Sequence, residues 1–159
     1  MFVYDISLAT PGVVTCSGTP NTEVATFTIK PGAASCGLQS MYATGRGSAL
    51  TSISGIVHRL VNFATASTSG TAITPKAKDT RITAAVATVT SGQTLAAGGS
   101  NRTNGLVIGH GAAGPGGYVA PNPDSPETMK GGTTGSLDAI NASATASLTF
   151  EWSAEILEN

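Results

Sequence analysis

The sequence predicts an all-β, antiparallel fold, and two observations support this. The first is the alternation of apolar and polar side chains over residues 143–157. Phe150, Trp152, Ala154 and Ile156 fall on one side, and Glu151, Ser153 and Glu155 fall on the other. A period of two is typical of a strand that is buried on one face, whereas a helix would scatter these residues around its axis. The second observation is that the rest of the chain consists of short β-branched runs between clusters of turn residues.

Length and composition predict a single domain over residues 1–159 with a core of small side chains. Hydrophobic residues make up 40% of the chain but aromatic residues only 5%, so alanine must fill much of the core. Charged residues are 11% and the net charge is −1. Such a surface offers no long-range attraction for nucleic acid or for an anionic membrane, and it favours association with other proteins.

The strands are expected in order along the chain. Residues 1–8 are extended and apolar, so residues 1–10 form either a first strand or an extended N-terminal arm. Further strands are predicted at 13–16, 23–30, 36–42, 71–74, 82–90, 105–110 and 143–157, and a long irregular stretch rich in Gly and Pro at 110–135. A series of short strands between turn clusters predicts a sandwich, a jelly roll or a barrel.

The segment 53–63 fits two patterns. Its apolar residues satisfy the spacing of an amphipathic helix, yet it is rich in β-branched residues and contains Gly55. We favour a strand that is buried on both faces.

The beginning of the chain has no basic region followed by a long apolar run, so neither a signal peptide nor a membrane anchor is expected there. No other apolar stretch approaches the roughly 18 residues of a membrane-spanning helix. Without a route through an oxidising compartment, Cys16 and Cys36 are predicted to be buried, unbridged thiols.

Motifs with chemical meaning are weak. A G-x-G-x-x-G pattern runs from Gly109 to Gly114, but Pro115 follows it and no helical pattern appears, which indicates a loop rather than a dinucleotide site. His58 is predicted to be a sheet residue, and His110 an exposed residue at a strand end. Neither histidine lies at metal-ligand spacing from a cysteine.

The acidic and basic residues favour surface roles. Glu151 and Glu155 share one side of the last strand and are expected to face solvent or another subunit rather than to act as a catalytic pair. Lys76, Lys78 and Arg81 form a small basic cluster that suits an acidic partner surface. We therefore expect no enzymatic activity, no cofactor and no metal.

Two segments resemble small jelly-roll proteins encoded among the structural genes of tailed bacteriophages. These are TASTSGTAITPKAKD at 65–79 and SLTFEWSAE at 147–155. The resemblance implies a jelly-roll-like sandwich that serves as a cement or head-decoration protein, commonly a homotrimer bound to the major capsid protein on the virion exterior after synthesis in the host cytoplasm. The alternative is a carbohydrate- or receptor-binding jelly-roll module of a tail or head fibre, for which Tyr42 and Tyr118 are the candidate aromatic platforms.

The partner interface is expected to involve six residues, with neither nucleic acid nor membrane as a partner. These residues are Phe2, Val3, Tyr4, Lys76, Lys78 and Tyr118. If residues 1–4 belong to an arm, their deletion should leave the melting temperature nearly unchanged and weaken only the binding to the shell.

Overall fold

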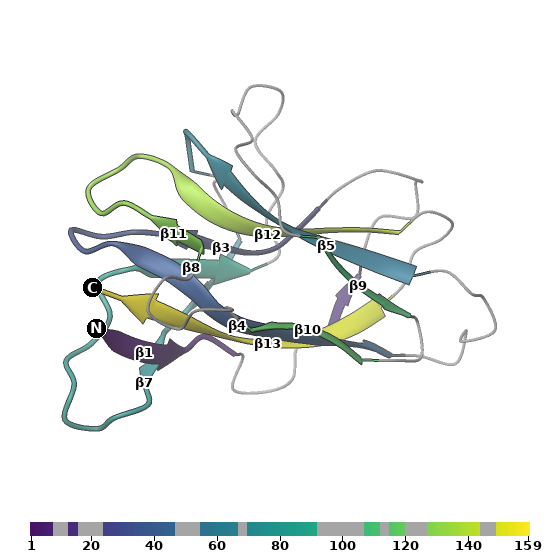
Figure 1. Cartoon of the computed structure of the whole chain (residues 1–159), viewed down its shortest axis with the longest axis horizontal. Coiled ribbons are helices and arrows are strands. Elements are labelled where there is room, and N and C mark those ends of the chain that lie inside the picture. Colours follow the sequence, from purple (N-terminus) through teal and green to yellow (C-terminus); the bar gives the residue numbers. More distant parts are fainter. Residues whose placement is uncertain are drawn as a thin grey trace.

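The computed structural model describes residues 1–7, 13–15, 24–46, 55–66, 70–91, 107–111, 115–119, 127–143 and 149–159. The regular secondary structure within these ranges consists of β-strands alone. The strands form two antiparallel sheets that pack face to face around a shared core (Figure 1). The predicted all-β sandwich is therefore confirmed. Within the described residues no helix is long and apolar enough to cross a membrane.

The two sheets have different strand orders. Sheet A runs β10 (Pro115–Val119), β4 (Cys36–Arg46), β13 (Thr149–Glu158), β1 (Phe2–Asp5), β7 (Lys76–Ala77), with β11 (Glu127–Met129) also beside β4 and β2 (Val13–Thr15) also beside β13. Sheet B runs β6 (Thr71–Ile73), β8 (Thr88–Ser91), β3 (Val24–Lys30), β12 (Ser136–Ser143), β5 (Gly55–Phe63), β9 (Val107–Gly111). Successive strands such as β3 and β4, or β12 and β13, lie in opposite sheets.

The last strand, β13, holds sheet A together. It pairs with β4 along its whole length, and its other edge pairs with β2 at the start and with β1 at the end. The predicted alternation is confirmed over the described residues, because Phe150, Trp152 and Ile156 are buried whereas Ser153 is exposed. Residues 144–148, at the start of the predicted strand, lie outside the described residues.

Aromatic contacts join the two sheets. The rings of Phe27 in β3 and Trp152 in β13 lie 4.8 Å apart between centroids, and His58 in β5 meets Phe150 in β13 edge-on at the same distance. Such tilted and edge-on arrangements suit the ring quadrupoles. Alanines of both sheets, Ala139 and Ala154 among them, are buried around these rings and let the layers approach. The histidine prediction holds for His58, which is fully buried in the sheet.

Several strands agree with the predictions. Within segment 53–63 the described residues 55–63 form a strand (β5) and not a helix. β2, β3, β6 and β9 lie within the predicted segments to within a residue. β4 is longer than predicted and continues to Arg46, because it follows its long partner β13. The G-x-G-x-x-G pattern begins in β9, and strand β10 rather than a helix begins at Pro115.

Two predictions about extended and irregular segments are wrong, and one strand was not predicted. The stretch 110–135 contains β10 and β11, which are short and pair with the edge of β4. Residues 136–143 form a separate strand, β12, in the middle of sheet B; its buried Asp138 and Asn141 conceal the alternation, and Asn141 Nδ2 donates to Thr26 Oγ1 at 2.7 Å.

The predicted strand 82–90 begins only at Thr88. The preceding residues, after β7, cross from sheet A to sheet B. Ile82 N donates to Asp79 O at 3.1 Å, and the Tyr4 hydroxyl donates to Thr83 O at 3.2 Å, so their backbone is held by turns and side chains rather than by a strand. Ile82 and Ala85 pack on the core from this crossing, which accounts for the apolar pattern.

The N-terminal residues form a strand of sheet A, not a detached arm. β1 pairs with β13 on one side and with β7 on the other, with Phe2 opposite Glu158 and Asp5 opposite Lys76. Tyr4 is 1% exposed, and Ile6 is fully buried. Of the two alternatives for the start of the chain, the first strand is therefore correct for residues 2–5.

This placement reverses the expectation for the N-terminal deletion. Replacing residues 1–4 by a single initiator Met removes a sheet strand and the buried Tyr4 ring. We expect it to lower the free energy of unfolding by at least about 3 kcal/mol, the usual cost of losing a large core side chain, and to lower the melting temperature accordingly.

The control is Phe2→Ser, which alters a side chain that is 47% exposed and keeps the strand. Its stability should stay within about 0.5 kcal/mol of the wild type. Thermal and denaturant unfolding measure both variants. A deletion variant that melts with the wild type would show that β1 contributes nothing to the core.

Candidate functional site

The residues that the sequence proposed as an interface do not form one surface. Tyr4 faces the core, so only Phe2 and Val3 of that trio reach solvent, and Val3 only in part. Tyr118 lies in β10 at the edge of sheet A, opposite Met41 of β4. The strands β4 and β13 separate Tyr118 from β1, which contains Phe2 and Val3, and from β7, which contains Lys76 and is followed by Lys78.

The basic cluster is largely neutralised by the chain's own carboxylates. Lys78 Nζ forms an ion pair with Glu155, and the hydrogen bond and charge of that carboxylate raise the pKa of Lys78. Arg81 Nη2 lies 2.6 Å from Asp79 Oδ2, and the hydrogen bonds from Arg81 lower the pKa of Asp79. Lys76 is opposite Asp5 in register. These cations therefore supply little net positive charge for an acidic partner.

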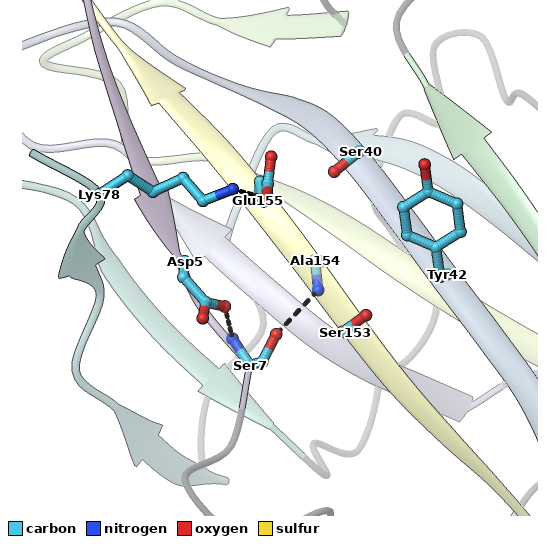
Figure 2. A pocket seen from close by; sticks show the side chains of 8 residues that line it. All are labelled: Asp5, Ser7, Ser40, Tyr42, Lys78, Ser153, Ala154 and Glu155. Atoms are coloured by element: carbon cyan, nitrogen blue, oxygen red, sulfur yellow. Dashed lines mark hydrogen bonds and ion pairs between the residues drawn. The ribbon is translucent and has the colours of Figure 1, made fainter.

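The structure instead brings together a set of polar residues on the outer face of sheet A. They surround a depression of about 240 Å³, which we call the sheet A depression. Its lining consists of Asp5, Ser7, Ser40, Tyr42, Lys78, Ser153, Ala154 and Glu155, from β1, β4, β13 and the residues that follow β1 and β7 (Figure 2).

Register explains why these side chains meet. Glu155 lies between Asp5 of β1 and Ser40 of β4, and Ser153 lies opposite Tyr42. Residues directly opposite each other in an antiparallel pair project from the same face. Two hydrogen bonds link the lining residues at one side of the depression. Ser7 N donates to Asp5 Oδ1 at 2.8 Å, and Ala154 N donates to Ser7 Oγ at 3.3 Å.

Tyr42 forms the aromatic side of the depression. Its ring is 52% exposed although it stands in the middle of β4. It rests on the edge strand β10 at Gly117, where an added Cβ would lie only 2.7 Å from Tyr42 Cδ1. The glycine thus leaves room for the ring against the sheet. Tyr42 ends the predicted strand 36–42, and its alternation with buried Met41 and Ala43 is the signal that places it on the outer face.

A second feature is an exposed apolar group at the end of the sandwich where the two termini meet (Figure 1). Met1, Phe2 and Val86 are each about half exposed, and we call them the terminal patch. Glu158 connects them: it lies opposite Phe2, and its buried carboxylate accepts hydrogen bonds from Val86 N at 3.0 and 3.1 Å and from Ala87 N. The backbone at Phe2 and Val86 is therefore held in place by strand pairing and by hydrogen bonds to Glu158.

Glu158 also affects two titratable neighbours. Burial, and then the charge of Glu158, raise the pKa of the Cys36 thiol to about 12. The same two causes raise the pKa of Tyr4. Cys36 is a buried free thiol, as predicted, whereas Cys16 lies outside the described residues.

Other candidate residues do not assemble into a site. Within the described ranges no group of three or more His, Cys, Asp or Glu side chains is placed to hold a metal ion. His110 lies in β9 opposite Ile56, whereas His58 lies two positions further along β5, opposite Ile108.

Comparison with known proteins adds little. No protein-family model and no curated protein matches the sequence. Among solved structures, the chain is similar to one titled "Structure of infectious bursal disease virus Gx strain", with 12% sequence identity over 99% of this chain and a TM-score of 0.25. The chain spans 42% of that viral chain. At this TM-score two structures need not share a topology.

The raised pKa values predict a loss of stability in alkali. Above pH 9.0, the ordinary pKa of the thiol, the unfolded chain gives up the Cys36 proton, whereas the folded chain keeps it up to about pH 12. The folded state then binds more protons, so the free energy of unfolding falls as the pH rises through this window. Tyr4, whose pKa is raised above 10.0, contributes a loss of the same sign.

Denaturant unfolding of the wild type and of Cys36→Ala across this pH range measures the effect. The variant should lose less stability than the wild type over the window, because the Cys36 contribution is absent while those of Tyr4 and Lys78 remain. Identical pH dependence in the two proteins would contradict the assignment to Cys36.

Proposed function

We propose that this chain is a structural virion protein, a cement or head-decoration protein that binds the major capsid protein on the exterior of a tailed-phage head. The sequence resemblance over residues 65–79 and 147–155 supports this proposal. The structural observation that carries it is the terminal patch. Exposed apolar side chains gathered at one place are typical of surfaces that bind other proteins.

The setting of the patch suits a contact between rigid subunits. Phe2 is held in β1 by pairing with β13, and Val86 is held through its N–H by Glu158. Side chains on fixed backbone lose little conformational freedom on binding, so more of the energy of apolar burial appears as affinity. The local ion pairs around Lys78 and Arg81 leave the surrounding surface nearly neutral. Binding would then depend on contact rather than on long-range attraction.

A homotrimer is the oligomeric state that the resemblance implies, and a net charge of −1 favours association. We expect the purified protein to form trimers in solution. Light scattering over a range of micromolar concentrations measures the mass. A stable monomer throughout that range would count against a self-assembling cement protein.

Binding to phage heads tests the role of the patch. Co-sedimentation with purified heads of the virus that encodes this chain should show at least about tenfold weaker binding for the double variant Phe2→Ser, Val86→Ser, a loss that corresponds to about 1.4 kcal/mol. Both side chains are about half exposed, so the melting temperature should change little.

The matched control is Val119→Ser, which alters an equally exposed apolar residue in the edge strand β10. It should bind heads like the wild type. If the wild-type protein fails to bind heads, the proposed function is wrong; if control and double variant weaken binding equally, the contact does not depend on the terminal patch.

The alternative function, a carbohydrate- or receptor-binding module of a fibre, has its own supporting observation. The exposed Tyr42 ring and its polar neighbours in the sheet A depression form the kind of platform that such a module needs.

A further inference from the structure

We propose that the sheet A depression is a carbohydrate-binding subsite, in which a neutral pyranose ring stacks on Tyr42 and its hydroxyl groups bond to Ser40, Ser153 and the neighbouring carboxylates. The proposal uses none of the residues of the terminal patch. It therefore stands or falls independently of binding to a phage head.

The aromatic ring provides the stacking surface. Tyr42 is seen nearly face-on in Figure 2, beside Ser40 and Ser153, in a view onto the outer face of β4 and β13. Its contact with Gly117 holds it against the sheet, and about half of its surface stays exposed. A pyranose presents polarised C–H groups on one face, and these are attracted to the negative face of an aromatic ring. A tyrosine that is already held in place loses little conformational entropy when it makes this contact.

Unused hydroxyl groups flank the ring. Ser40 is only 6% exposed, lines the depression, and forms no side-chain hydrogen bond with the part of the chain that the structure describes. The Ser40 hydroxyl is not shut off from solvent but opens into the depression. A ligand hydroxyl that reaches it can therefore replace the hydrogen bond that solvent makes there. Ser153, on the neighbouring strand opposite Tyr42, is exposed and likewise makes no side-chain bond among the described residues.

The charges select a neutral ligand. The lining contains two carboxylates, Asp5 and Glu155, and one ammonium group, that of Lys78, which is already paired with Glu155. This balance disfavours phosphate, sulfate and acidic sugars. Carboxylate oxygens accept hydrogen bonds from neighbouring hydroxyl groups of a sugar, and charged acceptors make the stronger bonds.

The size of the depression selects a single ring. Its volume of about 240 Å³ lies below the range of about 300–1,000 Å³ that is typical of pockets for larger ligands. One sugar unit, free or within a longer glycan, is therefore the ligand that we assign. A single subsite of this kind is expected to bind with a dissociation constant on the order of 1–10 mM.

Chemical-shift mapping of the ¹⁵N-labelled protein tests the proposal. The probes are the methyl glycosides of glucose, galactose, mannose and N-acetylglucosamine, with sorbitol as the matched polyol that has the hydroxyl groups but lacks a rigid ring face. At least one glycoside should give saturable shifts at the amides of Ser40, Tyr42, Ser153 and Glu155. Sorbitol should leave these amides unshifted at the same concentration.

Variants separate stacking from general effects on the fold. Tyr42→Phe should keep the binding of the glycoside, whereas Tyr42→Ala and Ser40→Ala should each weaken it, the former by about tenfold. Phe2→Ser, which changes an exposed aromatic residue outside the depression, should bind like the wild type. If Tyr42→Ala unfolds the edge of sheet A, the other two variants test the site, because both keep the aromatic ring. Weaker glycoside binding by Ser40→Ala than by Tyr42→Phe then supports the proposal, and equal binding by the two contradicts it.

Three results would overturn the proposal. One is the absence of shifts at these amides with every glycoside. Another is an equal response to sorbitol. The third is a shift of the same amides with protein concentration alone, which would assign this face to contact between copies of the chain.

Discussion

The contact between Trp152 and Phe27 is the interaction on which the rest of the structure depends. It joins the central strand of sheet A to sheet B at a ring distance of 4.8 Å, in a chain with few aromatic residues. Alanines around it let the sheets approach closely, so these rings supply much of the volume of the core. Because β13 carries Trp152 inward, its pleat must carry Ser153 and Glu155 outward. The core contact therefore also determines which residues form the outer face.

The end of β13 organises the second surface. Glu158 pairs with Phe2 of β1 and reaches the backbone of Val86 and Ala87, which belong to the crossing between the sheets. Tyr4 holds the same crossing through Thr83. One buried carboxylate and one buried hydroxyl thus fix three separate segments at the end where the termini meet, and the apolar side chains exposed there stand on a rigid support.

The two surfaces differ in chemistry and in position. The terminal patch is apolar and lies at an end of the sandwich, as expected of a contact with a protein subunit. The sheet A depression combines an aromatic face with hydroxyl and carboxylate groups, as expected of a site for a polyhydroxylated ligand. If the proposed head contact uses the terminal patch, the sheet A depression stays accessible.

The sequence by itself determined the fold class, the strand β13 with its inward and outward residues, and the strand β5, because hydrophobic alternation and β-branched composition are local signals. Only the tertiary structure decided that 136–143 is a central strand, since its buried Asn141 is accommodated there by the hydroxyl of Thr26 in the neighbouring strand β3. The same holds for β10 and β11, which are defined by pairing with β4. Of the candidate site, Tyr42 and Lys78 were visible in the sequence, but their meeting with Asp5 and Glu155 was not. That meeting depends on the register of three strands far apart in the chain, and no local pattern encodes register between them.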